Sequence, residues 1–333
     1  MRRIFIAIMV AATLWSGYWV VGSRSVRSSV EEWFQSRAVA GWDASYEELR
    51  VRGFPNRIDV TVSGLRLADP KTAIMWSAPY FQILRLSYKP NHVILNFPDT
   101  QTVVGAGQSV TVSSKKLQAS AVFLPGTDRN LTRANLAGDQ LTLTSDLGWS
   151  AAMESLLMAI RQNAAIDLAY DLGVEMQGLA LSANSTENDT SASEMLADID
   201  RLNLDATVSF NAPWDSKAID APRPVIQAID LRALQIDLGD KDISAAGALT
   251  LDLFGQADGL IKVTSNNWQD ILRIADLTEW FAKATMIAVR AELIRLTETS
   301  NADESVTVPL RFASGNVFLG SVNLGQQPRL FQP

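Results

Sequence analysis

Cysteine is absent from the 333 residues, and histidine occurs only once. The absence of cysteine excludes disulfides, thiolate metal sites, iron–sulfur clusters and cysteine nucleophiles. The single histidine, His92, ends the turn-like run Lys89-Pro90-Asn91-His92, ahead of a strand pattern. One histidine without cysteine does not supply the usual structural zinc site, so we expect a surface histidine, no metal and no cofactor.

Catalytic motifs are also missing. The sequence has neither a Gly-x-Ser-x-Gly nucleophile elbow nor a Gly-Lys-Ser/Thr phosphate loop, and Gly105-Ala106-Gly107 lacks the third glycine of a dinucleotide site. Glycoside hydrolysis needs only two suitably spaced carboxylates, and two pairs are near in sequence: Asp198 with Asp200, and Asp240 with Asp242. Among 36 acidic residues such pairs arise by chance. We therefore expect no enzymatic activity, and keep a carboxylate hydrolase as a minor alternative.

Basic clusters are lacking as well. The 29 lysines and arginines are outnumbered by 36 acidic residues, which gives a net charge of −7, and the isoelectric point is near 4.9. Nucleic acid is therefore a poor partner. The composition is 47% hydrophobic with nine tryptophans, as in a folded protein with a substantial core.

One long apolar stretch stands at the N-terminus. After Met1-Arg2-Arg3, residues 4–22 carry no charged side chain, and as a helix they would reach about 28 Å, the thickness of a bilayer's hydrocarbon core. The two arginines predict a cytoplasmic N-terminus, and the aromatic residues near the far end suit a membrane interface: Trp15, Tyr18 and Trp19. We expect residues 1–23 to be an uncleaved transmembrane anchor. The alternatives are a signal sequence cleaved after Val20-Val21-Gly22 and, less favoured, a buried helix.

A short amphipathic helix follows the anchor. Ser28 and Ser29 resemble a helix cap, and Gly41 would end the helix. Its apolar residues share one face: Val30, Trp33, Phe34 and Ala38. We assign residues 24–41 to this helix, which either continues the anchor or lies along the membrane surface.

Beyond residue 42 the apolar residues recur with a period of two. Ile58, Val60 and Val62 alternate with polar residues, and after Gly64 the phase shifts by one residue, which predicts a glycine bulge or a sharp bend. Similar half-apolar segments recur at irregular intervals: residues 141–143, 178–181, 234–238, 247–251 and 259–263. Such segments pair into an antiparallel sheet with one hydrophobic face.

Two helical patterns are candidates to cover that sheet. The first has a stripe of Trp149, Met153, Leu156, Leu157 and Ile160. The second, residues 277–298, would be about 33 Å long, and its stripe includes Ala284, Ala288, Ala291 and Ile294. Four charged residues exclude a second membrane span there: Glu279, Lys283, Arg290 and Arg295. Residues 183–195 are small and polar, which predicts a flexible loop within a single β-rich domain, 42–333.

Aromatic residues crowd the first strands of this domain. Trp42, Phe54, Trp76 and Phe81 are candidates to line an apolar groove that takes a lipid chain. The alternative, which aromatic clusters usually represent, is ordinary core.

Several turn and strand motifs resemble an uncharacterised alphaproteobacterial family of anchored envelope proteins, a domain of unknown function. The motifs are Gly53-Phe54-Pro55-Asn56-Arg57, Trp76-Ser77-Ala78-Pro79, Val308-Pro309-Leu310-Arg311-Phe312 and the glycine-punctuated strands from Gly315 to Gly325. The resemblance implies an inner-membrane or periplasmic protein and, more distantly, similarity to AsmA-type proteins, whose curved sheets are associated with lipid handling. It assigns no catalytic residues.

These observations predict an α+β, predominantly β protein: a large curved antiparallel sheet, a long C-terminal amphipathic helix and an N-terminal membrane helix. We expect a single-pass inner-membrane protein with its bulk in the periplasm, whose partners are the bilayer and a lipid or other amphiphile bound along the apolar sheet face. The alternative is a structural or assembly factor with a self-filled core that contacts other envelope proteins.

Overall fold

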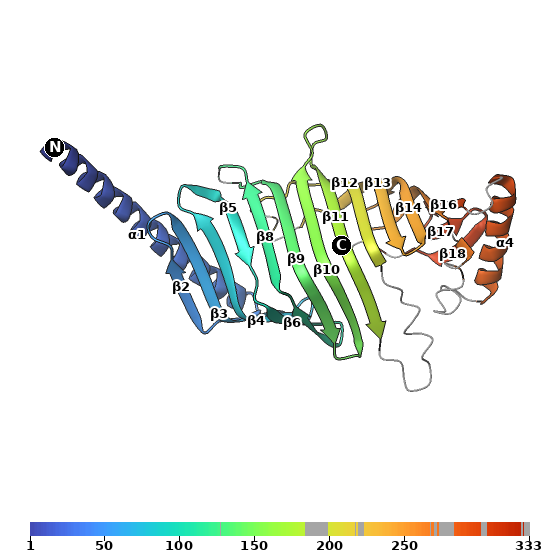
Figure 1. Ribbon diagram of the computed structural model, residues 1–333, viewed down its shortest axis with the longest axis horizontal. Helices are drawn as coiled ribbons and strands as arrows, with labels where there is room; N and C mark the ends of the chain where they lie inside the picture. The colour runs from blue at the N-terminus through green and yellow to red at the C-terminus, as the bar shows by residue number, and fades with distance from the viewer. Residues whose placement is uncertain are drawn as a thin grey trace. The chain divides into compact units, whose positions relative to one another are not determined.

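The computed structural model describes residues 1–126, 128–183, 199–216, 218, 223–266, 268–269, 272, 283–300, 305–327 and 329. Within them, 18 strands form one hydrogen-bonded antiparallel sheet, which confirms the mainly β fold (Figure 1). The contacts divide the chain into two units, each described below by itself: unit 1 is 1–125 with 134–150, and unit 2 is 126–133 with 151–333.

Unit 1 begins with helix α1, Arg2–Val39, and continues as a succession of strands. Its strands are β1 (Asp43–Ser45), β2 (Glu48–Arg52), β3 (Arg57–Asp69), β4 (Ile74–Leu86), β5 (Lys89–Asn96), β6 (Thr100–Gly105), β7 (Gln108–Ser113), β8 (Lys116–Phe123) and most of β9 (Leu131–Ser145). His92 lies inside β5, opposite Val122, and not in a turn as expected.

Unit 2 holds the remaining strands and helix α4, Lys283–Ser300. Its strands are most of β10 (Trp149–Gln162), β11 (Ala169–Ala183), β12 (Ile199–Phe210), β13 (Ile226–Leu238), β14 (Lys241–Leu251), β15 (Ala257–Ser265), β16 (Val306–Ala313), β17 (Asn316–Leu319) and β18 (Val322–Gln326). The expected loop 183–195 lies outside the described residues, apart from Ala183 at the end of β11.

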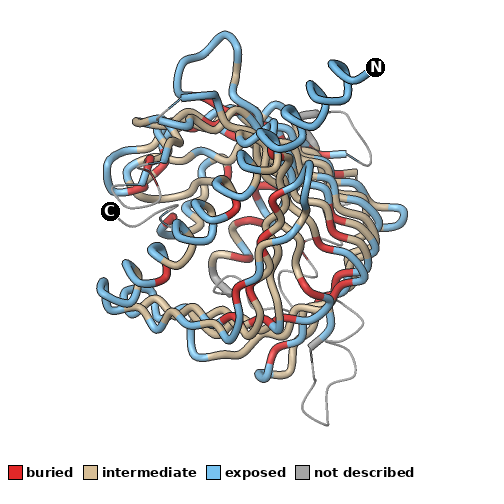
Figure 2. The backbone as a smooth tube through the Cα atoms, turned by 90° about the vertical axis from the view of Figure 1, so that its left-hand side faces the viewer, coloured by how far each residue is buried: buried red, intermediate tan, exposed pale blue. Residues whose placement is uncertain are grey.

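Helix α1 is continuous from the apolar stretch into the segment 24–41. It ends at Val39 with Ala40 as its C-cap, and Gly41 follows with φ +89°. Its first half is exposed, as the pale blue N-terminal turns in Figure 2 show. Its second half packs on the sheet, because Phe34 joins the buried cluster of Leu49, Val60, Val62, Leu65 and Ala78, with Val26 and Val30 beside it. The amphipathic segment therefore continues the first helix and covers strands of unit 1.

Gly64 resolves the phase shift in β3 by a bend. Its φ is +60°, while the register with β4 is continuous on both sides, from Ser63 opposite Tyr80 to Leu65 opposite Ala78. The strand thus turns about the glycine without inserting an extra residue, so it is not a bulge. The bend keeps Val62 and Leu65 in the same buried cluster.

The helix predicted around residues 149–160 is wrong, because these residues form β10. Exposure alternates along Ala151, Ala152, Met153 and Glu154, and Leu156 is buried while Leu157 is exposed. Ala, Met, Leu and Glu are good helix formers, but such intrinsic preferences are small, and hydrogen bonding within the sheet overrides them.

Helix α4 covers the C-terminal strands with a different face from the one predicted. Met286, Val289 and Leu293 are buried in a cluster with Val306, Val308 and Leu319 of the strands. Ala291 and Ile294 of the predicted stripe are exposed. The larger Met, Val and Leu side chains bury more apolar surface than the alanines would. The beginning of the expected helix, 277–282, lies outside the described residues.

Candidate functional site

The four predicted groove residues do not form one group. Trp42 is half-buried after α1, with its ring centroid 5.8 Å from the guanidinium carbon of Arg37. Phe54 is exposed at the turn between β2 and β3, and its ring meets that of Trp19 edge to face at 5.5 Å. Only Trp76 and Phe81 come together, with ring centroids 5.3 Å apart.

Phe97, which follows β5, completes the aromatic cluster of Trp76 and Phe81. Its ring lies 5.3 Å from Phe81 and 6.1 Å from Trp76. The indole nitrogen of Trp76 donates a hydrogen bond of 2.7 Å to the buried Gln101 side chain. All three rings are half-buried, so the cluster closes one part of the core and still presents ring surface.

The apolar face of unit 1 continues from this cluster across neighbouring strands. Strand register places one row of side chains on a single face: Val60 of β3, Ile83 of β4, Leu95 of β5 and Ala119 of β8. Val60 is fully buried near the second half of α1, while the other three are half-buried. The row is thus closed at α1 and more open away from it.

A larger apolar surface spans six strands of unit 2. In antiparallel pairs, directly opposed residues place their side chains on the same face. Three such rows run from β11 to β16: Tyr170, Val208, Ile229, Leu249, Gly259 and Phe312; Leu172, Ala206, Leu231, Gly247, Ile261 and Leu310; and Val174, Leu204, Leu234, Ala245, Val263 and Val308. We call these rows the apolar face of unit 2.

Coverage of the apolar face of unit 2 differs along the sheet. At one end α4 packs against β16 and β18, and Val308 is buried there. Ala245, Leu249 and Ile261 are buried in the middle. At the other end, on β11 to β13, six members of the rows are half-buried: Leu172, Val174, Leu204, Ile229, Leu231 and Leu234. The other three members there are buried: Tyr170, Ala206 and Val208. This partly exposed end is the candidate binding surface.

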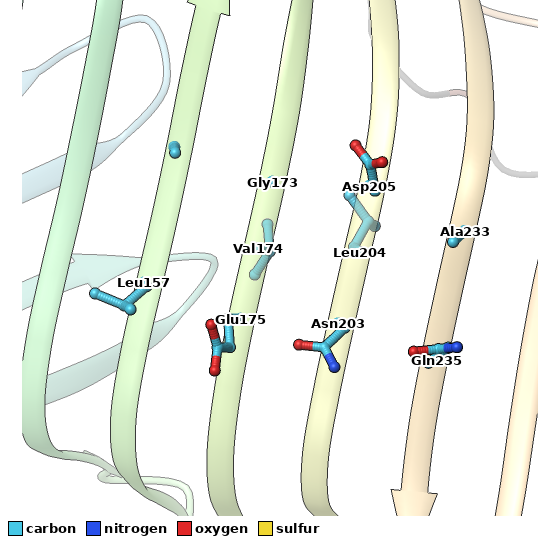
Figure 3. A pocket seen from close by; sticks show the side chains of 10 residues that line it. Leu157, Gly173, Val174, Glu175, Asn203, Leu204, Asp205, Ala233 and Gln235 are labelled. Carbon is cyan, nitrogen blue, oxygen red and sulfur yellow. The ribbon is translucent and has the colours of Figure 1, made fainter.

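The opposite face of the same strands is polar. Register aligns Glu175, Asn203, Gln235, Ser244, Thr264 and Thr307 across β11 to β16. Figure 3 shows Glu175, Asn203 and Gln235 side by side on three strands, with Val174 and Leu204 behind the ribbon. A hollow of about 450 Å³ lies here because Gly173 and Ala233 have little or no side chain. The sheet of unit 2 is therefore amphipathic.

Charges on the polar face are paired through Arg232. Its guanidinium contacts the carboxylates of Asp205 and of Asp171, the latter at 3.0 Å. A hydrogen bond from Asn163, followed by those from Arg232 and Thr207, lowers the pKa of Asp171, and the hydrogen bond from Arg232 lowers the pKa of Asp205. Both carboxylates are thereby held charged, so they cross-link β11, β12 and β13.

Sequence reasoning recognised the separate strands but not the aligned rows. The alternating patterns of residues 234–238, 247–251 and 259–263 were a usable signal for β13, β14 and β15. The register that brings their apolar residues together depends on how one strand pairs with the next, which the periodicity within one segment does not report. The candidate acids at Asp240 and Asp242 lie at the exposed β13–β14 turn, Asp200 accepts a hydrogen bond from the Gly239 amide, and Asp198 lies outside the described residues.

The fold and the surface define a class: an antiparallel β-sheet protein with one apolar and one polar sheet face, preceded by an apolar N-terminal helix. A family model described as an uncharacterized protein conserved in bacteria, DUF2125, matches residues 19–328. The chain therefore belongs to this family. No curated protein and no solved structure matches the chain.

Proposed function

We propose that this protein is a non-enzymatic envelope protein that binds a lipid or another amphiphile along the apolar face of unit 2. The observation that carries the proposal is the half-buried end of that face on β11 to β13. Soluble surfaces rarely leave contiguous apolar side chains accessible without a partner. An acyl chain laid on them gains about 0.8 kcal/mol for each buried CH₂ group.

The dimensions of the surface suit an elongated ligand. Six strands at the usual spacing place the first and last members of a row about 24 Å apart. The rows offer only hydrocarbon and aromatic groups, so they select by apolarity and not by hydrogen bonding. The polar face behind them keeps the sheet compatible with water.

We further propose that α1 anchors the protein in the inner membrane, with a cytoplasmic N-terminus and the sheet in the periplasm. Among the described residues, one helix, Arg2–Val39, is long and apolar enough to cross a membrane, as an anchor or a signal sequence would be. Arg2 and Arg3 support the orientation. An alphaproteobacterial source and a distant relation to AsmA-type proteins belong to this proposal, and both fit a lipid-handling sheet beside a membrane.

Lipid extraction and mass spectrometry of residues 24–333, which lack the apolar stretch of α1 and are purified without detergent, test the binding proposal. Leu234→Glu puts a charge on the apolar face, and the neighbouring Gln235→Glu puts the same charge on the polar face. We expect the unchanged protein and the Gln235→Glu variant to carry lipid at similar occupancy, and Leu234→Glu to lose most of it, because burying a carboxylate beside an acyl chain is costly.

A second variant separates lost binding from lost folding. Val174→Phe enlarges the face but keeps it apolar, so it should retain lipid. Circular dichroism and thermal melting then show whether Leu234→Glu is folded. Equal lipid content in folded Leu234→Glu and in the unchanged protein would contradict the proposal.

A structural or assembly role is the second candidate. The observation in its favour is that α4 with β16 to β18, and Phe34 of α1 with β2 to β4, already form closed cores at parts of the two units. If the unchanged protein carries no lipid when purified without detergent, this candidate is preferred, and the half-buried rows would then contact another envelope protein.

A further inference from the structure

Three aromatic side chains of α1 hold two turns of unit 1. The indole nitrogens of Trp15 and Trp19 donate hydrogen bonds to the carbonyl oxygens of Pro55, at 2.9 Å, and Arg57, at 2.6 Å. The hydroxyl of Tyr18 donates one of 2.9 Å to the carbonyl oxygen of Ser87. The turn between β2 and β3 and the turn between β4 and β5 are thus bonded to the apolar part of the helix.

These contacts fix the level of the two turns along α1. Trp15 and Trp19 precede Gly22, the end of the uncharged stretch, by seven and three residues. At 1.5 Å for each residue, the turns lie about 5 to 10 Å before the end of the apolar stretch. If α1 spans the membrane, both turns are held at the level of the outer leaflet and not above it.

The turns have the composition and the bonding that this layer requires. Phe54 and Tyr88 project from them with 57% and 56% of their surface exposed, and aromatic residues favour the interface between headgroups and hydrocarbon. The backbone is bonded internally: the Arg57 amide donates to the Gly53 carbonyl at 2.8 Å, and the Ser87 amide donates to the Asn56 carbonyl at 2.9 Å. Such internal bonding lowers the cost of leaving bulk water.

We propose that this end of unit 1 is a second membrane contact, in which Phe54 and Tyr88 insert into the outer leaflet of the bilayer beside α1. The partner is the lipid bilayer itself. The inference rests on the proposed anchoring by α1 but not on ligand binding by the apolar face of unit 2. Two points of insertion would fix the orientation of the first strands relative to the membrane, which a single helix does not do.

Because the chain has no cysteine, one introduced cysteine gives one labelling site. Phe54→Cys and Tyr88→Cys place a polarity-sensitive fluorophore on the two turns. Ile74→Cys is the matched control, since Ile74 is also an exposed apolar residue, at 49%, but lies at the other end of the β3–β4 hairpin, opposite Asp69. Thirteen strand residues separate the two ends, about 40 Å.

The full-length labelled proteins are reconstituted into lipid nanodiscs, with and without lipids brominated on their acyl chains. We expect blue-shifted emission and loss of fluorescence with brominated lipid for the labels at positions 54 and 88, and neither change for the label at position 74. Labels at 54 and 88 that behave like the label at 74 would overturn the proposal.

The mass of the mature protein completes the test. Removal of the N-terminus after Gly22 would also overturn the inference, because Trp15, Tyr18 and Trp19 would be lost. Lipid extraction from residues 24–333, purified without detergent and outside nanodiscs, reports on the apolar face of unit 2 separately. If lipid is retained but the fluorophores at positions 54 and 88 emit as they would in water, only the proposed membrane contact is contradicted. If these fluorophores are inserted in the bilayer but no lipid is extracted, only the proposed ligand binding is contradicted.

Discussion

Glu292 is a buried acid in the apolar contact between α4 and the C-terminal strands. Only 7% of its surface is exposed. Its carboxylate accepts hydrogen bonds from the Arg295 guanidinium at 2.8 and 2.9 Å, and from the amide and hydroxyl of Ser321, each at 3.4 Å. The hydrogen bond from Arg295 is the largest cause that lowers the pKa of Glu292 to about 2.

This carboxylate predicts an acid-sensitive stability of unit 2. A folded-state pKa of about 2, against an ordinary value of 4.5, favours the folded state fully above pH 4.5. The contribution is lost as the pH falls from 4.5 toward 2. In thermal melting between pH 2 and 7, Glu292→Gln should be less stable than the unchanged protein near neutrality, and the difference should shrink toward pH 2.

Glu175→Gln serves as the control for that series. Glu175 is an exposed carboxylate on β11, so its replacement should change the melting temperature little at any pH. A constant difference between Glu292→Gln and the unchanged protein over the whole pH range would show that the ionised carboxylate is not what stabilises this contact.

At the scale of the strands, β14 and β15 approach each other closely at Gly247. It lies opposite Ile261 with φ +154°. A Cβ atom added there would lie 2.1 Å from the Leu260 carbonyl oxygen and 2.8 Å from the Ile261 Cα. Both contacts are with backbone, which cannot move without disturbing the ladder.

Gly247→Ala should therefore destabilise the protein, by about 1–3 kcal/mol or more, through clash and backbone strain. Gly173→Ala is the matched control, because Gly173 is also a strand glycine but an added Cβ meets nothing within 4 Å. This control should be neutral or stabilising by up to about 1 kcal/mol. Urea unfolding followed by circular dichroism compares them, and equal midpoints would contradict the predicted close approach.

Agreement between the local preference of a segment and its pairing in the sheet decides which strands could be predicted from the sequence. Val60 and Val62 in β3 are β-branched and alternate with polar residues, so local preference and pairing agree. In β10, the run around Met153 and Leu156 is rich in good helix formers, and pairing with neighbouring strands overrides this local preference. Only strands whose local pattern agrees with their tertiary contacts could be recognised.

The candidate site could likewise be predicted from the sequence only in part. Trp42, Phe54, Trp76 and Phe81 were predicted to line one groove, and of these only Trp76 and Phe81, both on β4, come together. Phe97 was missed because it joins them through the pairing of β4 with β5. The rows of unit 2 need five successive registers, each between segments that are separate in sequence. No periodicity within one segment specifies those registers.

At the scale of the whole chain, α1 joins two different parts in one element. Its first half is the apolar stretch and its second half carries Phe34 into the core of unit 1. A continuous helix of 38 residues is about 57 Å long, enough for a membrane span and about five further turns. Because the helix has no interruption between the halves, the proposed anchor would be rigidly coupled to the sheet.

Two truncations separate the proposed anchoring by the first half of α1 from the packing of its second half. Removal of residues 1–23 leaves Val26, Val30 and Phe34 on β2 to β4, so residues 24–333 should keep a folded unit 1 while losing membrane association. Removal of residues 1–41 uncovers the buried cluster, and the loss of Phe34 alone should cost about 3–5 kcal/mol. Phe34→Ala in the 24–333 chain is the control, because it removes the side chain and keeps the helix.

We expect thermal stability to fall from 24–333 to its Phe34→Ala variant and further to 42–333. Equal melting of 24–333 and 42–333 would mean that the second half of α1 contributes nothing to the core, and anchoring and folding would then be independent.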